Sequence, residues 1–387
     1  MIYTLAIANY RSLREVVLPL DQLTVITGPN GSGKSNLYRA LRLLSDTAMG
    51  GAVSSLAREG GIGSAIWAGP ETFSRAVKEG RQAVQGGPRS NPVSIKLGFA
   101  ADDLSYSVEF GLPTPPKGAF AHDPEIKREA IWHGDKWRGS TALADRKKPL
   151  VRVRDDDGRW LTVAQHLAPY DSMLTEVADP GSAPEVLLLR EQIRSWRFYD
   201  SFRTDENAPA RMAQIGTRTP ALYHDGRDLA AALQTIIEIG DRDMLQKSVD
   251  DAFPGAELRV EVNQGRFTVA FLQYGLLRPL SQAELSDGTL RYLLLTAALL
   301  TPRPPGLIVL NEPETSLHPD LVPALARLIL RASRNSQTWV VTHSEQLTQL
   351  LAENQNCQLI RLHRELGETH IEGQNLMNTP VWHWPPR

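Results

Sequence analysis

Gly28-Pro-Asn-Gly-Ser-Gly-Lys-Ser-Asn36 decides the fold, because its first eight residues match Gly-x-x-x-x-Gly-Lys-(Ser/Thr) at every fixed position. The apolar, β-branched run Leu23–Thr27 before it predicts a buried strand, and the apolar positions between Leu37 and Leu44 after it share one helical face. A strand, a glycine-rich turn and a helix N-terminus together wrap backbone N–H groups around a phosphate. The stretch therefore predicts a nucleotide-phosphate site.

The residue types within this loop suit a triphosphate and a divalent cation. Glycine lets the backbone approach a ligand closely. The Lys34 ammonium supplies a positive charge to the β- and γ-phosphates, and the Ser35 hydroxyl is placed to ligate Mg²⁺. We expect ATP and Mg²⁺ here, with a further five binding residues in the loop: Asn30, Gly31, Ser32, Gly33 and Asn36.

Length and composition are those of a globular protein with a large core. The chain has 387 residues, 42% of them hydrophobic and 22% charged, and a formal net charge of −2. Any contact with DNA must therefore use a local basic patch. Cys357 is the one cysteine, which excludes a disulfide framework. The sequence shows neither a signal peptide nor an apolar run that could span a membrane, so we expect a cytoplasmic protein without a membrane partner.

Alternating apolar residues predict several antiparallel hairpins, and periodic ones predict helices. The expected hairpins pair residues 3–9 with 14–20, 93–99 with 104–110, 130–133 with 136–138, 150–154 with 159–163, and 258–262 with 267–273. The expected helices lie near 71–82, 185–200 and 228–253. Three consecutive aspartates, residues 155–157, fit either a turn or a metal site, and their neighbour Gly158 favours the turn.

Two later strands predict the second half of the site. The apolar run Gly306–Leu310 ends in Asn311-Glu312, which places an acidic side chain where it can orient or deprotonate an attacking water. The run Thr338–Thr342 ends in His343, at the edge of an open α/β sheet where ligands bind, so His343 is placed to hydrogen-bond the γ-phosphate.

The segment Leu285–Arg291, Leu-Ser-Asp-Gly-Thr-Leu-Arg, predicts the start of a helix that runs to Leu300. Ser286 or Asp287 is suited to cap that helix. A capped helix N-terminus with a glycine, here Gly288, is also a phosphate site.

In these four motifs the chain resembles the ABC-class ATPase heads of the SMC/RecF/OLD group, most closely the compact AAA ATPases of RecF type. Ile7-Ala-Asn-Tyr-Arg-Ser-Leu13 is similar to the N-terminal strand and turn of that group, and Gly33-Lys-Ser-Asn36 continues the likeness. Leu285–Arg291 resembles the signature motif, and Leu310–Pro319 resembles Walker B with its dimer-contact loop. Val341-Thr-His-Ser344 resembles the switch histidine.

The resemblance implies a P-loop α/β fold with a mixed central sheet, an antiparallel β-subdomain and a helical lobe. It divides the chain into an ATPase lobe (1–112), an inserted part (113–225) and a second ATPase lobe (226–387). The insert lacks the long coiled coil of SMC proteins, and the segment after His343 is too short for the TOPRIM domain of OLD nucleases, so we expect a bare head.

The resemblance also assigns roles to single residues. Arg11 and Ser12 would lie near the adenine and phosphates, Glu312 and His343 would be catalytic, and Ser286 and Gly288 would contact the γ-phosphate held by a second subunit. Asn311 stands where most Walker B strands carry Asp, so we expect a metal ligand of lower affinity and slow turnover. The Q-loop glutamine is not assigned; Gln82 and Gln165 are the candidates.

Three functions fit these residues. The favoured one is an ATPase that dimerises on ATP and acts on DNA in repair or genome maintenance. Two groups of basic residues are candidates for a basic face that binds DNA. The first is the arginines and lysines of 146–154, and the second is Arg190, Arg194, Arg197, Arg203 and Arg211. Such runs are also typical of a solvated surface. The alternative is an ATPase switch that controls a partner effector, such as a nuclease in phage defence. The third, a nucleotide-binding subunit of a membrane transporter, fits the signature motif alone.

Overall fold

The structure is a computed structural model that describes residues 1–86, 94–115, 118–177, 179–200, 202–375 and 377–386. The chain forms two compact units. The first contains Met1–Asp21, Gly28–Ser195 and Ile360–Arg387, and the second contains Gln22–Thr27 and Trp196–Leu359. Because these units group residues by contact, they cut the chain at other places than 112 and 225, and the three-part division by role stays a prediction.

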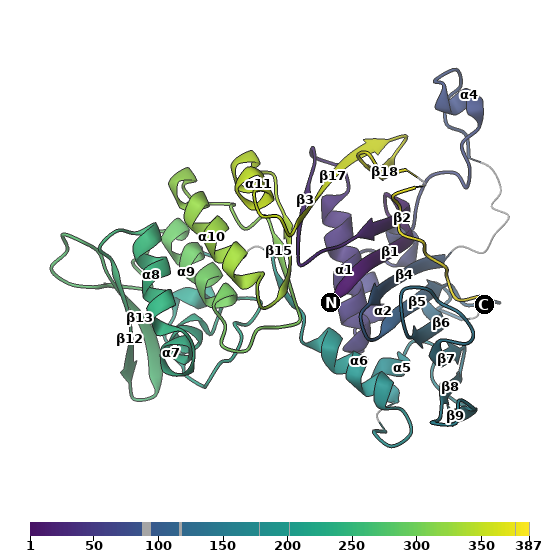
Figure 1. Cartoon of the computed structure of the whole chain (residues 1–387), viewed down its shortest axis with the longest axis horizontal. Helices are drawn as coiled ribbons and strands as arrows, with labels where there is room; N and C mark the ends of the chain where they lie inside the picture. Colours follow the sequence, from purple (N-terminus) through teal and green to yellow (C-terminus); the bar gives the residue numbers. More distant parts are fainter. Residues whose placement is uncertain (87–93, 116–117, 178, 201, 376, 387) are drawn as a thin grey trace. The chain divides into compact units, whose positions relative to one another are not determined.

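An eight-stranded antiparallel sheet dominates the first unit (Figure 1). Its order is β2-β1-β4-β5-β6-β7-β8-β9. The strands are β1 (Ile2–Tyr10), β2 (Leu13–Pro19), β4 (Ser94–Ala101), β5 (Ser105–Gly111), β6 (Glu125–Trp132), β7 (Ala142–Lys147), β8 (Leu150–Arg154) and β9 (Trp160–Ala164). The antiparallel β-subdomain is confirmed, and so are its hairpins β1–β2, β4–β5 and β8–β9; Val93, expected to begin one of them, lies outside the described residues.

Helices and a late hairpin complete the first unit. They are α1 (Lys34–Ala48), α2 (Ala52–Arg58), α3 (Ile62–Ala65), α4 (Arg75–Lys78), α5 (Met173–Glu176), α6 (Pro184–Arg194), β17 (Cys357–Glu365) and β18 (Glu368–Ile371). The first three residues of β17 belong to the second unit. Helix α1 lies against the sheet at β1 and β4, with Leu37, Leu41 and Leu44 fully buried. The predicted apolar face of α1 is therefore the face that packs.

A parallel sheet forms the centre of the second unit. Its strands are β10 (Arg197–Tyr199), β15 (Leu307–Asn311), β16 (Gln337–Val341) and β3 (Leu23–Thr27), in that spatial order. They are the parallel part of a six-stranded sheet that continues from β3 to β17 and β18. Each neighbouring pair is parallel, in the registers Tyr199↔Leu310, Asn311↔Val341 and Val341↔Ile26. Their continuous apolar runs suit a sheet covered on both faces. All four strands therefore end at one edge.

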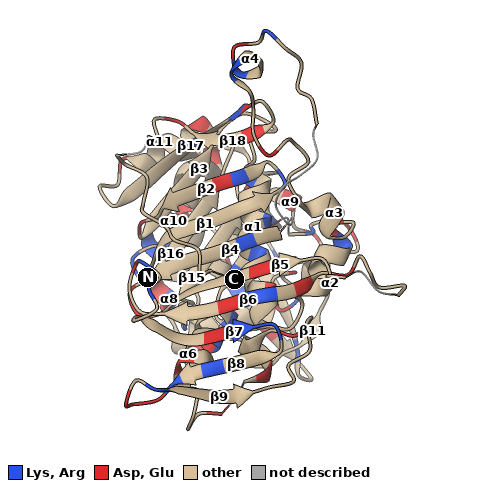
Figure 2. Ribbon diagram, turned by 90° about the vertical axis from the view of Figure 1, so that its right-hand side faces the viewer, with Lys and Arg blue, Asp and Glu red and all other residues tan. Residues whose placement is uncertain are grey.

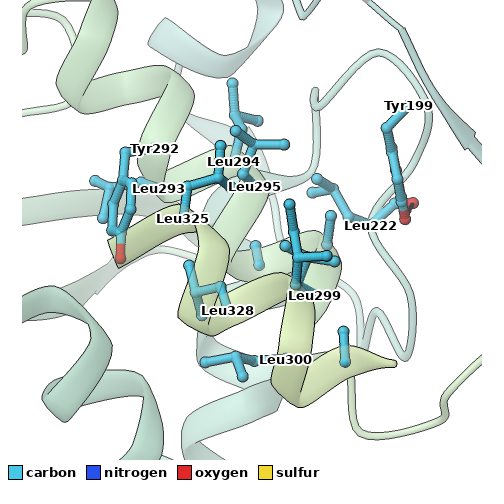
Figure 3. Close-up of a cluster of buried hydrophobic side chains, with 14 of the residues drawn as sticks. Tyr199, Leu222, Tyr292, Leu293, Leu294, Leu295, Leu299, Leu300, Leu325 and Leu328 are labelled. Atoms are coloured by element: carbon cyan, nitrogen blue, oxygen red, sulfur yellow. Dashed lines mark hydrogen bonds between the residues drawn. The ribbon is translucent and has the colours of Figure 1, made fainter. Parts of the chain in front are cut away.

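The remaining elements of the second unit surround this sheet with apolar side chains. They are α7 (Leu229–Ile239), α8 (Arg242–Ala252), α9 (Asp287–Leu299), α10 (Val322–Ala332), α11 (Glu345–Ala352), the 3₁₀ turns Pro209–Arg211 and Pro319–Leu321, and β11 (Gln214–Ile215), β12 (Glu257–Asn263), β13 (Arg266–Leu272) and β14 (Leu280–Ser281). Figure 3 shows the leucines of α9 against Leu325 and Leu328 of α10. The predicted helical lobe and the hairpin β12–β13 are confirmed.

Two expectations about local structure are wrong. The strand expected at 136–138 is a loop, and β6 pairs instead with β7, which begins at Ala142. The helix expected over 185–200 ends at Arg194, and Arg197–Tyr199 forms β10 because its backbone pairs with β15.

The residues 155–157 form a turn, and within the described residues no group of three or more His, Cys, Asp or Glu side chains is placed to hold a metal. None of the helices described combines the length and apolarity that crossing a bilayer requires.

Several arginines of the candidate basic face have acidic partners, so the face stays a prediction. On strands β4 to β8, Figure 2 shows basic and acidic residues interspersed. Asp145 lies 2.8 Å from Arg128 and 3.4 Å from Arg152. In the other series, Arg203 pairs with Asp205 and Arg211 with Asp287.

Arg146 belongs to the interior of the first unit. Its Nη1 lies 2.7 Å from Oε2 of Glu129, and both side chains are 0% exposed. Glu129 also accepts hydrogen bonds from the Tyr106 hydroxyl (2.7 Å) and the Met173 N–H (2.8 Å). Burial, and then the charge of Glu129, raise the pKa of Tyr106 well above its ordinary value. This network joins β5, β6 and β7 to the start of α5.

Arg146→Ala should lower the free energy of unfolding by about 3–5 kcal/mol, because it leaves the buried Glu129 carboxylate without its cation. Urea unfolding followed by circular dichroism measures this. The matched control is Arg159→Ala, which removes an exposed ion pair with Asp157 and should cost less than about 1 kcal/mol. Equal losses for the two variants would contradict a structural role for Arg146.

Candidate functional site

The glycine-rich loop follows β3 directly and requires glycine at two positions. Gly28 and Gly33 have φ values of 149° and 108°, and a Cβ at Gly28 would lie 2.3 Å from the Leu362 carbonyl oxygen. At Gly33 it would lie 2.1 Å from Oγ1 of Thr369. Helix α1 then begins at Lys34 without a side-chain cap. A helix N-terminus of this kind favours an anion.

The Lys34 side chain folds back under the glycine-rich loop. Its side chain is largely buried, at 4% exposure for the residue, and its Nζ donates to the carbonyl oxygens of Gly28 (2.6 Å) and Pro29 (3.0 Å). Asn30, Gly31 and Ser35 are exposed, whereas Ser32 and Gly33 are buried. A buried ammonium beneath an exposed row of loop residues suits a phosphate ligand.

Hydroxyl groups tie the loop to the N-terminal turn. Ser12 Oγ accepts from Asn36 Nδ2 (2.8 Å) and lies 2.7 Å from Thr369 Oγ1. Thr369, on β18, donates to the Ser32 carbonyl oxygen at 2.8 Å. The structure thus brings Ser12 and Asn36 together beside the loop, as the resemblance implied, and adds Thr369, which is separated from Ser32 by most of the chain and carries no local sequence signal.

Arg11 is held beside the same turn by an acidic partner. Its Nε and Nη2 donate to Glu59 Oε2 at 3.0 and 2.8 Å, and the Tyr10 hydroxyl donates to the same carboxylate. Arg11 has φ 50°, a left-handed value that non-glycine residues seldom adopt. Its role toward a nucleotide stays a prediction.

In the second unit, the ends of β15 and β16 bring together Glu312 and His343. His343 Nε2 lies 3.0 Å from Glu312 Oε1, and both side chains are 38% exposed. Glu312 has φ 48° and donates its N–H to the Val341 carbonyl oxygen at 2.7 Å. Left-handed backbone at such a residue is typical of functional sites. The pair is accessible and held in one geometry.

Glu314 holds residues 342–344, the loop that carries His343, and the sequence analysis did not predict this role. Its Oε1 accepts from the Thr342 hydroxyl (2.5 Å) and from the N–H groups of His343 (3.0 Å) and Ser344 (3.2 Å). One carboxylate oxygen therefore sets the backbone that presents His343. The sequence signal that could have predicted this role is the position of Glu314 directly after Glu312-Pro313.

The segment Leu285–Arg291 exposes two of its residues at the start of α9. Ser286 and Asp287 are exposed while Leu285 is buried, and Ser286 caps α9 by accepting the Thr289 N–H. A Cβ at Gly288 would lie 3.1 Å from the Ser316 carbonyl oxygen, in the loop after β15. Arg211 holds the segment by donating to the Leu285 carbonyl oxygen and Asp287 Oδ1, each at 2.7 Å.

Arg291 links α9 to the end of β15. The residue is 4% exposed, and its Nη2 donates to the Glu312 carbonyl oxygen at 3.1 Å. Burial lowers the pKa of Arg291, and the charges of Glu314, Asp200 and Glu312 oppose that shift. A buried guanidinium thus lies among three carboxylates.

Asn311 fits an oxygen-preferring ion through one atom. Its Nδ2 donates to Asp200 Oδ1 at 2.8 Å, and its Oδ1 is buried without a hydrogen-bond partner in the part of the chain described. Mg²⁺ takes few protein oxygens when phosphates supply others. The amide oxygen of Asn311 is of that type, and the metal-binding roles of Ser35 and Asn311 stay predictions. Gln82 and Gln165 follow no strand of the parallel sheet, so the Q-loop glutamine stays unassigned.

Comparison with known proteins identifies the family and the fold. The family described as "AAA domain, putative AbiEii toxin, Type IV TA system" matches residues 23–348. An OLD nuclease of Thermus scotoductus is 46% identical over 44 residues, which cover 11% of this chain and 8% of the nuclease's own length. The chain therefore matches only a small part of that relative.

Solved structures of SMC heads share the fold. The SMC head bound to the C-winged helix domain of ScpA has a TM-score of 0.51 at 16% identity, covering 97% of this chain and 98% of that one. The head with a coiled coil and joint from Pyrococcus yayanosii has a TM-score of 0.52 at 12% identity, covering 98% of each chain. The predicted fold, a P-loop ATPase of the ABC class similar to SMC heads, is confirmed.

Thr369→Val should weaken ATP binding about 5- to 10-fold, because it removes the hydroxyl that holds the Ser32 carbonyl and Ser12. Titration calorimetry with a non-hydrolysable ATP analogue measures the affinity. Thr268→Val is the control: its hydroxyl is 3.5 Å from the Glu261 carbonyl oxygen in the second unit, so no change is expected. Unchanged affinity in Thr369→Val would show that β18 does not support the loop.

Proposed function

This chain belongs to the AAA-domain family described as putative AbiEii toxins of type IV toxin–antitoxin systems, and we propose that it hydrolyses ATP to ADP and phosphate as an SMC-like head. The observation that carries the proposal is the common edge of the parallel sheet. Strand β3 ends there and leads into the glycine-rich loop, and β15 and β16 present Glu312 and His343. Ligands of open α/β sheets bind at this edge.

The residues divide the work by their chemistry. The loop N–H groups and Lys34 bind the phosphates, and Ser35 and Asn311 are the residues that would hold Mg²⁺, which when bound neutralises charge on the β- and γ-phosphate oxygens. Glu312 orients the attacking water and accepts its proton. His343, paired with Glu312 at 3.0 Å, is placed to donate a hydrogen bond toward the γ-phosphate.

ATP-dependent pairing of two copies accounts for the exposed signature segment. The 13-residue helix α9 begins at Asp287 with Ser286 as its N-cap, and both residues are exposed. Helix N-termini attract phosphate, and the resemblance assigns this one to the nucleotide of a second subunit. ATP that binds better to the closed pair than to single copies shifts the equilibrium toward the pair.

We propose that the ATP-dependent dimer acts on DNA, because the fold is similar to that of SMC heads. The paired arginines leave fewer free basic side chains than expected. A DNA contact would then neutralise few phosphates, and its affinity would fall with salt less steeply than that of an extended basic face. The family description and the OLD nuclease match favour a second candidate: an ATPase switch that controls an effector protein.

Lys34→Ala should abolish ATP binding, and Glu312→Gln should keep binding while lowering turnover about 100-fold or more, because it lacks the base. Phosphate release, measured with and without duplex DNA, tests both. Faster turnover with DNA supports the DNA role, and DNA-independent turnover favours the effector switch. Wild-type activity in either variant would contradict the assigned roles.

Sedimentation of Glu312→Gln gives a second readout from the same proteins. Because this variant retains ATP, it should accumulate as a dimer at micromolar concentration. Lys34→Ala should stay monomeric under the same conditions. A monomeric Glu312→Gln at saturating ATP would argue against pairing through the nucleotide.

A further inference from the structure

The end of β15 carries an amide where a metal-binding strand end would be expected to carry charge. Asn311 is the last residue of β15, directly before Glu312. An amide oxygen can accept a hydrogen bond from a cation's water, but it brings no negative charge, and hard divalent cations favour carboxylates. The missing charge raises the question of which neighbouring residue supplies it.

Asp200 is the carboxylate that bonds this amide. It is the first residue after β10, and β10 is the parallel neighbour of β15, with Tyr199 opposite Leu310. The next residues, Asp200 and Asn311, therefore leave the sheet side by side. Asn311 Nδ2 donates to Asp200 Oδ1 at 2.8 Å.

This hydrogen bond fixes which way the amide faces. Only the NH₂ group of Asn311 can donate to a carboxylate, so the amide oxygen must point elsewhere. That oxygen, Oδ1, is buried and lacks a partner among the described residues. A buried acceptor without a donor is costly, and its presence marks a place where a ligand or its water supplies the donor.

We propose that Asp200 is a positioning residue for the Mg²⁺ of bound Mg–ATP. Asp200 holds the Asn311 amide so that Oδ1 faces the ion's water shell, and its carboxylate supplies the negative charge that the amide lacks. Glu312 and Glu314 add to this field, while Arg291 is the buried cation that opposes it. The inference rests on the proposed ATPase function and assigns a residue outside the expected motifs.

Asp200→Asn tests the charge alone, because its side-chain oxygen can still accept the hydrogen bond from Asn311. We expect the Mg²⁺ concentration needed for half-maximal binding of a fluorescent ATP analogue to rise about 10-fold, the effect typical of losing an outer-shell partner. Mn²⁺ binding to the same complex, followed by electron paramagnetic resonance, should weaken in parallel.

Exchanging the two side chains gives the decisive comparison. Asp200→Asn combined with Asn311→Asp restores one carboxylate and one amide in hydrogen-bonding distance, so it should recover the Mg²⁺ dependence to within about 3-fold of wild type. Asn311→Asp alone places two carboxylates next to each other, so its Mg²⁺ dependence should differ from that of the exchanged pair. Asp205→Asn, at an exposed carboxylate bonded to Arg203, is the control and should behave as wild type.

The outcomes separate this inference from the function on which it rests. Wild-type Mg²⁺ dependence in Asp200→Asn overturns the inference alone, and so does a lower melting temperature without any shift in Mg²⁺ dependence. If the wild-type protein binds no ATP analogue at any Mg²⁺ concentration, the proposed function fails and the inference fails with it.

Discussion

Backbone hydrogen bonds between parallel strands are the constraint on which the candidate site depends. The registers Leu310↔Val340 and Val340↔Val25 bring three strands of distant sequence into one ladder. Because parallel strands all end at the same edge, Glu312 and His343 emerge where β3 passes into the glycine-rich loop. The apolar side chains that cover both faces of the sheet maintain this alignment, since a shift in register would move Glu312 and His343 away from the end of β3.

The parts of the site that sequence could predict are those with local signals. The loop, its flanking strand and helix, the strand before Glu312 and the cap at Ser286 all depend on residues within a few positions of one another. Periodicity likewise located the hairpins β4–β5 and β12–β13. Where a signal was weak, tertiary pairing decided the outcome: Arg197–Tyr199 became a strand because β15 offered backbone partners.

The parts that sequence could not predict are contacts between distant residues. Thr369 supports Ser32, Asp200 bonds Asn311, and Glu129 takes Arg146 into the interior. No spacing rule links such residues, because the fold alone brings them together. Counting arginines similarly overstated the basic surface, since charge in sequence does not show which carboxylate lies opposite.

Mixing two inactive variants most directly tests the central claim that one nucleotide needs elements from two copies. Lys34→Ala disables the loop, and Ser286→Asp keeps a helix cap while placing a negative charge toward the phosphate. Each variant alone should be inactive, and an equal mixture should regain a measurable part of wild-type hydrolysis. Each mixed dimer keeps one complete site, formed by the loop of the Ser286→Asp copy and Ser286 of the Lys34→Ala copy. A mixture as inactive as its parts, or a fully active Ser286→Asp protein, would contradict the account.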